Sequence, residues 1–176
     1  PEVVAQARFY EEKYGKPIPV IAAGGLYTGE DIYRITQLGA SGVQLGSRFV
    51  TTEECDADRA FKQTYIDSRK EDIRIIASPV GMPGRAISDD FIREVAEGKK
   101  RPKRCAFHCI RTCDYRKSPY CIMLALYNAA RGNLRNGYAF AGANAYMADK
   151  ITTVRETISS LVNEFSRKAA EFKNRG

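Results

Sequence analysis

Two short apolar segments that each run into glycine constrain the fold of this chain more than any other feature. The first, Val20 to Ala23, is followed by Gly24 and Gly25, and the second lies in the stretch GVQLGSRFV and ends at Gly46 and Ser47. Apolar residues without alternation are typical of a parallel strand that is buried on both faces. We therefore expect two buried strands that each end in a glycine turn.

A helix is predicted between the two strands, over Gly29 to Leu38. Thr28 and Asp31 have the spacing of a capping box at its start, and Gly39 supplies its C-terminal stop. A helical crossover makes the strands on either side of it parallel. The free N–H groups at such a helix start also suit an anion, most often a phosphate.

The two glycine turns belong to the same edge of the predicted sheet, because the strands are parallel. In a (β/α)8 barrel, the loops after the seventh and eighth strands form the phosphate site at this edge. Glycine lets the backbone approach a phosphate closely, although it is also the residue that most easily forms a tight strand-to-helix turn. Two such turns in consecutive units favour the phosphate.

The remaining pattern indicates an α/β chain with a helical end. Besides the first βα unit, we expect helices at 3–16, 58–67, 89–97, 122–131 and 153–165 and an extended segment at 73–77. The segment SPVGMPGRA has two prolines and two glycines and is typical of a shaped loop. The last helix opens with Thr153 and Glu156 in capping-box spacing. Its apolar face is expected to pack on the body of the protein and contains Val154, Ile158, Leu161, Val162 and Phe165.

Composition narrows the class of protein. The formal net charge is +7, but much of the excess lies in the run from Lys99 to Arg104, which is typical of a solvated linker. We expect no nucleic-acid partner, because no recognition motif accompanies the charge. No apolar run approaches the roughly 20 residues that a membrane helix needs, so we expect a cytoplasmic protein without a membrane partner.

Three motifs in order, IPVIAAGGLYTGEDI, LGASGVQLGSRFV and SPVGMPGRAI, resemble the C-terminal part of the nitronate monooxygenase family, formerly 2-nitropropane dioxygenases. The related flavin-dependent enoyl-acyl carrier protein reductase II shares them, and the resemblance continues through FAGANAYMADKI. It implies a TIM-type (β/α)8 barrel that holds FMN non-covalently, with the flavin phosphate on backbone amides of the two turns. Carried over by position, the FMN-binding residues are Ala23, Gly24, Gly25, Gln44, Gly46 and Ser47.

The family's catalytic histidine lies in a glycine-rich GGH-type motif ahead of this region, and this sequence has no such motif. The sole histidine, His108, lies among cysteines, so no catalytic residue is assigned. Two βα units cannot close a barrel. We therefore expect the sequence to be the C-terminal portion of a roughly doubled chain, with the missing N-terminal part of the barrel as its partner. The expected organisation is 1–98 as barrel, 99–121 as a basic linker and cysteine-rich loop, and 122–176 as a helical C-terminal extension that packs on the barrel.

The resemblance implies an FMN-dependent oxidoreductase that oxidises a small alkyl nitronate with dioxygen. The alternatives are an NAD(P)H-dependent enoyl-acyl carrier protein reductase II and, from another class, a noncatalytic phosphate- or metal-binding fragment. The turn motifs do not separate the two enzymes, because both would use the same phosphate turns. A homo-oligomer is left open.

The stretch CAFHCIRTCDYRKSPYC forms a cluster of cysteines. Cys105, Cys109, Cys113 and Cys121 could hold an iron–sulfur cluster or a zinc ion, and His108 could replace one of them. Their spacing matches no standard pattern, since ferredoxins and zinc fingers favour gaps of two residues. The alternative is a loop of free thiols in a reducing compartment.

Overall fold

The computed structural model describes residues 1–111 and 113–174. In chain order its α-helices, 3-10 helices (η) and strands are α1 (Glu2–Tyr14), β1 (Ile21–Ala23), α2 (Gly29–Gln37), β2 (Gly42–Gln44), α3 (Ser47–Val50), α4 (Arg59–Asp67), η1 (Lys70–Asp72), β3 (Ile73–Ile76), β4 (Gly84–Ile87), α5 (Asp90–Ala96), α6 (Ile122–Ala130), η2 (Leu134–Asn136), η3 (Ala145–Met147) and α7 (Val154–Lys173). The chain is thus α/β with a C-terminal helix, and every predicted helix is present.

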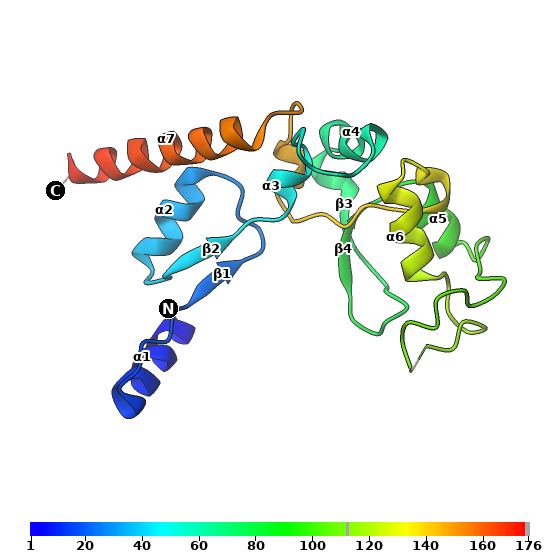
Figure 1. Ribbon diagram of the computed structural model, residues 1–176, viewed down its shortest axis with the longest axis horizontal. Helices are drawn as coiled ribbons and strands as arrows, with labels where there is room; N and C mark the ends of the chain where they lie inside the picture. The colour runs from blue at the N-terminus through cyan, green and yellow to red at the C-terminus, as the bar shows by residue number, and fades with distance from the viewer. Residues whose placement is uncertain (112, 175–176) are drawn as a thin grey trace.

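The first βα unit is built as predicted. β1 and β2 pair in parallel, with Ala23 opposite Gln44, and α2 crosses between them (Figure 1). The expected burial of β1 on both faces is wrong, because Ile21 is 55% exposed. A strand is buried on both faces only when layers cover both sides of its sheet, and in the described part of the chain this sheet has two strands.

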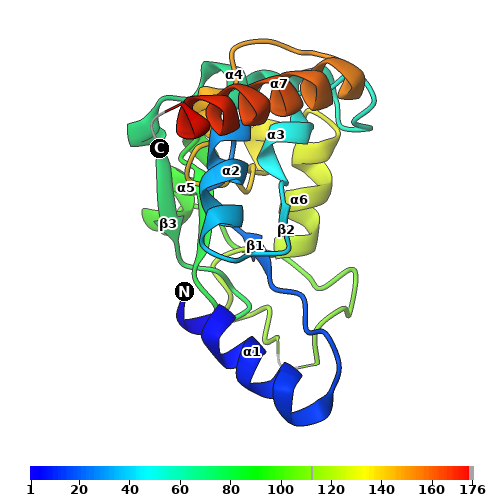
Figure 2. The same ribbon diagram turned by 90° about the vertical axis from the view of Figure 1, so that its left-hand side faces the viewer.

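The long helix α7 packs across α2, as Figures 1 and 2 both show. Leu161 on α7 is buried, and the rings of Phe165 and Tyr33 meet edge to face with their centroids 5.5 Å apart. The expected apolar face packs only in part, since Ile158 and Val162 remain 50% and 56% exposed. The helix also runs further than expected, to Lys173.

A second unit is formed by the hairpin of β3 and β4 with α4, α5 and α6 around it (Figure 1). Its antiparallel pairing places Ile75 opposite Arg85, so the end of the segment expected to be only a loop is a strand. Two hydrophobic clusters form the core of the described chain, and the first also takes in Tyr27 from the βα unit. They contain Tyr27, Tyr65, Ile87, Ala139, Ala141, Ala145 and Ala148 in the first and Ile76, Ala86, Phe91, Tyr120, Ala125 and Tyr138 in the second.

Residues 139–148, here called the bridging segment, run from the hairpin unit to the βα unit. The N–H of Ile87 donates to the carbonyl of Ala139 at 3.0 Å, and the N–H of Ala141 donates to the carbonyl of Arg85 at 3.0 Å. The hydroxyl of Tyr65 donates to the carbonyl of Phe140. The segment is therefore attached to β4 and α4 before it reaches the glycine turns.

Two parts of the chain lie outside the βα unit and the hairpin unit. The described residues of 99–121 contain neither helix nor strand. α1 extends from the body in Figure 2, and its Val3, Phe9 and Tyr14 are 67%, 57% and 61% exposed. Within the described ranges, no helix has the length and apolar character needed to cross a bilayer.

Candidate phosphate-binding turns

The two glycine turns lie side by side. β1 ends at Ala23 and β2 ends at Gln44, and these two residues are partners in the parallel register. The turn through Gly24 follows β1 and the turn through Gly46 follows β2, so both turns lie at the same edge of the sheet. The six residues proposed from the sequence for FMN are thus brought together, although their binding of FMN stays a prediction.

The turn backbones are open to a ligand. Gly24 and Gly25 have φ angles of 89° and 69°. Residues with a Cβ rarely adopt this left-handed backbone conformation. A Cβ built on Gly24, Gly25 or Gly46 would meet no described protein atom within 4 Å. A phosphate group fits such turns, because backbone that is not covered by side chains can donate its N–H groups to an anion.

The bridging segment contacts both turns. The Gly142 N–H donates to Ser47 Oγ at 2.8 Å, and the side-chain amide of Asn144 donates to the Gly25 carbonyl at 2.7 Å. Sequence reasoning missed both Gly142 and Asn144. The available signal was the run of small residues in FAGANA, which permits close approach between backbones.

The start of α2 is not an anion site, contrary to the sequence expectation. Asp31 accepts from the N–H groups of Tyr27 and Thr28 at 3.0 and 3.1 Å, and Glu164 accepts from the N–H of Gly29 at 2.7 Å. The capping box itself is confirmed, since Thr28 also accepts from Asp31 N–H. Burial acts to raise the pKa of Asp31, but the hydrogen bonds that Asp31 accepts from Tyr27, Thr28 and Arg34 outweigh burial and lower that pKa. Carboxylates already occupy the positions that an anion would need.

Arg48, which follows Ser47 in the sequence, directs its side chain to Tyr27. The Arg48 guanidinium lies over the ring of Tyr27, with its Cζ atom 4.7 Å from the ring centroid. Among the described residues, the buried Arg48 Nε and the Tyr27 hydroxyl have no hydrogen-bond partner. Burial raises the pKa of Tyr27, and Arg48 opposes that rise. The guanidinium is therefore in cation–π contact with the ring face of Tyr27.

The four cysteines of the loop share one small cavity. Cys105, Cys109, Cys113 and Cys121 all line a space of about 30 Å³, together with Tyr120. In residues 1–111 and 113–174, however, no group of three or more His, Cys, Asp or Glu side chains is arranged to hold a metal ion. An iron–sulfur cluster or zinc ion is therefore not supported. His108 is exposed and has a left-handed backbone with φ 47°.

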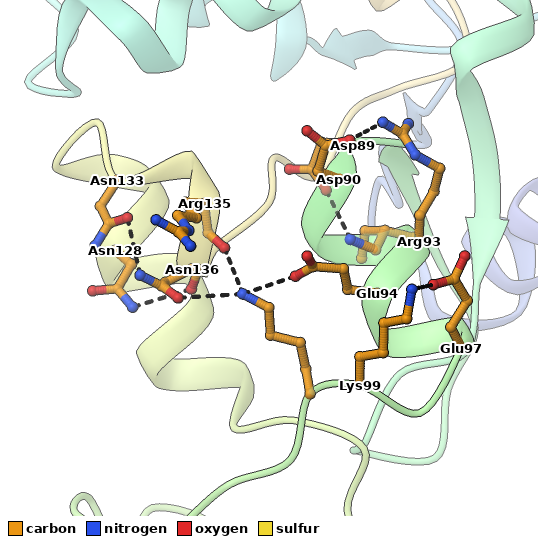
Figure 3. A network of polar contacts seen from close by, with 12 residues as sticks. Asp89, Asp90, Arg93, Glu94, Glu97, Lys99, Asn128, Asn133, Arg135 and Asn136 are labelled. Atoms are coloured by element: carbon orange, nitrogen blue, oxygen red, sulfur yellow. Dashed lines mark hydrogen bonds and ion pairs between the residues drawn. The ribbon is translucent and has the colours of Figure 1, made fainter.

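A separate polar network joins α5 to η2 (Figure 3). The Lys100 ammonium lies 3.0 Å from Glu94 and donates to the Arg135 carbonyl at 2.8 Å. Asp89 caps α5 by accepting from Ile92 N–H at 2.9 Å, while its Oδ2 is buried without a partner in the described chain. Burial raises the pKa of Asp89 to about 6. The network connects secondary-structure elements and lies outside the glycine turns.

Together, the parallel βα unit and its paired open glycine turns define an α/β protein with a candidate phosphate-binding edge. The family model described as nitronate monooxygenase matches residues 2–164, and the chain belongs to that family. The family resemblance expected from the sequence is confirmed.

Individual relatives match a shorter part of the chain. It is 36% identical over 80 residues to a probable nitronate monooxygenase of Staphylococcus saprophyticus and 38% identical over 80 residues to one of Staphylococcus haemolyticus. Each match covers 46% of this chain and 22% of the relative. The chain thus aligns with about a fifth of those proteins.

Solved structures extend the similarity. FabK from Thermotoga maritima superposes with a TM-score of 0.73 at 25% identity, covering 92% of this chain and 48% of FabK. Nitroalkane oxidase from Streptomyces ansochromogenes shares the fold with a TM-score of 0.63 at 21% identity, over 90% of this chain and 42% of that protein. The chain spans about half the length of these proteins. The expected relation to enoyl-acyl carrier protein reductase II is supported by FabK.

Proposed function

We propose that this chain supplies the FMN phosphate site of an FMN-dependent oxidoreductase of the nitronate monooxygenase type. The observation that carries the proposal is the pairing of Ala23 with Gln44, which places two open glycine turns at one sheet edge. Family membership supports the choice of a flavin among phosphate-bearing cofactors.

The roles of the residues follow from their chemistry. Gly24, Gly25 and Gly46 would present backbone N–H groups to the phosphate, and the Ser47 hydroxyl would donate a further hydrogen bond. FMN, when bound, supplies the transfer of electrons between substrate and acceptor. This chain's contribution is to bind and orient the cofactor, and we assign it no catalytic residue.

The exposed apolar side chains of α1 and β1 indicate a further contact surface. Phe9 and Tyr14 on α1 and Ile21 on β1 are each more than half exposed. The matched region covers 48% of FabK. We propose that the rest of a (β/α)8 barrel covers this side, because parallel barrel strands are normally buried between their neighbours and an outer helical layer.

Two reaction classes fit this proposal. Oxidation of a small alkyl nitronate with dioxygen is favoured by the family match and by the staphylococcal relatives. Reduction of an enoyl thioester with NAD(P)H is the second candidate, and the similarity to FabK over 92% of this chain favours it. Both would bring an organic substrate to the flavin.

The native protein, purified without air, would test the proposal. We expect a visible flavin spectrum and release of FMN on denaturation. Oxygen consumption with an alkyl nitronate would support the monooxygenase, while NAD(P)H oxidation dependent on a crotonyl thioester would support the reductase. A colourless protein that does not take up added FMN would contradict both and leave a noncatalytic phosphate-binding fragment as the better account.

A further inference from the structure

The bridging segment donates one hydrogen bond to each of the two glycine turns. The Gly142 N–H donates to Ser47 Oγ at 2.8 Å, and Asn144 Nδ2 donates to the Gly25 carbonyl at 2.7 Å. We propose that Gly142 and Asn144 are positioning residues that fix the two turns relative to each other, so that one phosphate group can contact both. This inference rests on the proposed FMN site.

The bridging segment is suited to hold other backbone in place because it is itself well anchored. Phe140 forms an antiparallel bridge with Ala86 of β4, and its carbonyl accepts from the Tyr65 hydroxyl. Ala139 and Ala145 are fully buried. Alanine has no side-chain rotamers to lose on burial, so this packing costs little conformational entropy. The hairpin unit thereby determines where Gly142 and Asn144 lie.

At the second turn, the contact defines which hydrogen bond Ser47 can make. A serine hydroxyl has one hydrogen to donate and two lone pairs that accept. The Gly142 N–H uses an acceptor position of Ser47 Oγ, so the hydroxyl hydrogen is directed elsewhere. A phosphate oxygen accepts such a hydrogen. The approach is close, since a Cβ built on Gly142 would lie 3.1 Å from Ser47 Oγ.

At the first turn, the contact limits a flexible backbone. Gly24 and Gly25 have wide conformational freedom, and ordering them on ligand binding costs entropy. The bond from Asn144 fixes the Gly25 carbonyl. In a trans peptide unit the C=O and the following N–H point in opposite directions, so the direction of the Leu26 N–H is fixed as well. The turn is thus ordered before a ligand binds.

Substitution of Asn144 tests this inference. Asn144→Asp keeps the shape but loses the amide donor, and Asn144→Ala removes the donor without adding charge. Asn163→Asp is the matched control, because Asn163 is exposed on α7. We would measure the FMN dissociation constant of each purified native-length protein by quenching of flavin fluorescence, and hydrogen exchange across residues 22–28 without FMN.

We expect both Asn144 variants to bind FMN roughly tenfold more weakly, as loss of one hydrogen bond typically produces. Exchange across residues 22–28 should be faster in both, and Asn163→Asp should match the unaltered protein. Asn144 variants with unchanged FMN affinity, or with weaker binding but unchanged exchange in the turn, would overturn the inference. Failure of the unaltered protein to bind FMN would instead defeat the proposed function.

Discussion

The backbone N–H of Gly29 donates to Oε2 of Glu164 across 2.7 Å, and this bond joins the start of α2 to the side of α7. The two helices approach so closely here that a Cβ on Gly29 would lie 2.0 Å from the Leu161 carbonyl oxygen and 2.6 Å from the Phe165 nitrogen. The C-terminal helix is therefore part of the βα unit that carries the glycine turns.

Gly29→Ala should destabilise the protein by about 1–3 kcal/mol, because the added methyl group forces α2 and α7 apart. Ser159→Ala is the control, since Ser159 is exposed on α7. Denaturant unfolding of both variants would measure the change. Equal free energies of unfolding for Gly29→Ala and the control would contradict the close packing.

Asp89 should make the protein less stable as the pH rises from about 4 to about 6. Its pKa is about 6 in the folded state, because burial disfavours the charged carboxylate, and near 4 in an unfolded chain. The folded state then binds more protons within this window, so the free energy of unfolding falls with increasing pH.

Asp89→Asn should remove that part of the pH dependence, since its amide keeps an oxygen for the Ile92 N–H and does not titrate. Denaturant unfolding between pH 4 and pH 7 would compare the variant with the unaltered protein. If the free energy of unfolding changes with pH in the same way for both proteins, Asp89 does not contribute to the pH dependence of stability.

Cys109 and Cys113 should react first with a thiol reagent. Both are exposed, whereas Cys55, Cys105 and Cys121 are only partly exposed. Timed alkylation with iodoacetamide, followed by peptide mass spectrometry, would give the order. If Cys109 and Cys113 were labelled more slowly than Cys55, the greater exposure of Cys109 and Cys113 would be contradicted.

Local signals in the sequence predicted much of the fold. The capping boxes at Thr28 and Thr153 marked the starts of α2 and α7 correctly, because a cap is formed by residues three positions apart. The parallel pairing of β1 with β2 followed from the helix between them. In these cases the interacting groups lie close in sequence, or the chain connectivity determines the arrangement.

Contacts between distant residues were not predictable in the same way. The strand at Gly84–Ile87 was missed because the prolines and glycines just before it indicate a loop. The hydrogen bond from Asn144 to Gly25 joins residues 119 positions apart. The spacing of apolar residues along the sequence does not predict a contact between such distant residues. The occupation of the α2 start by Glu164 was hidden for the same reason, which made that helix start look suitable for an anion.

The most direct test of the central claim is the FMN affinity of Gly25→Val beside that of Gly98→Val. Both glycines have a left-handed backbone, with φ 69° and 72°, and both have open space where a Cβ would lie, so the backbone strain of the two substitutions is matched. If the turns bind the FMN phosphate, Gly25→Val should weaken FMN binding at least tenfold while Gly98→Val leaves it within about twofold. Equal FMN affinity in the two variants would contradict the assignment of the phosphate to these turns.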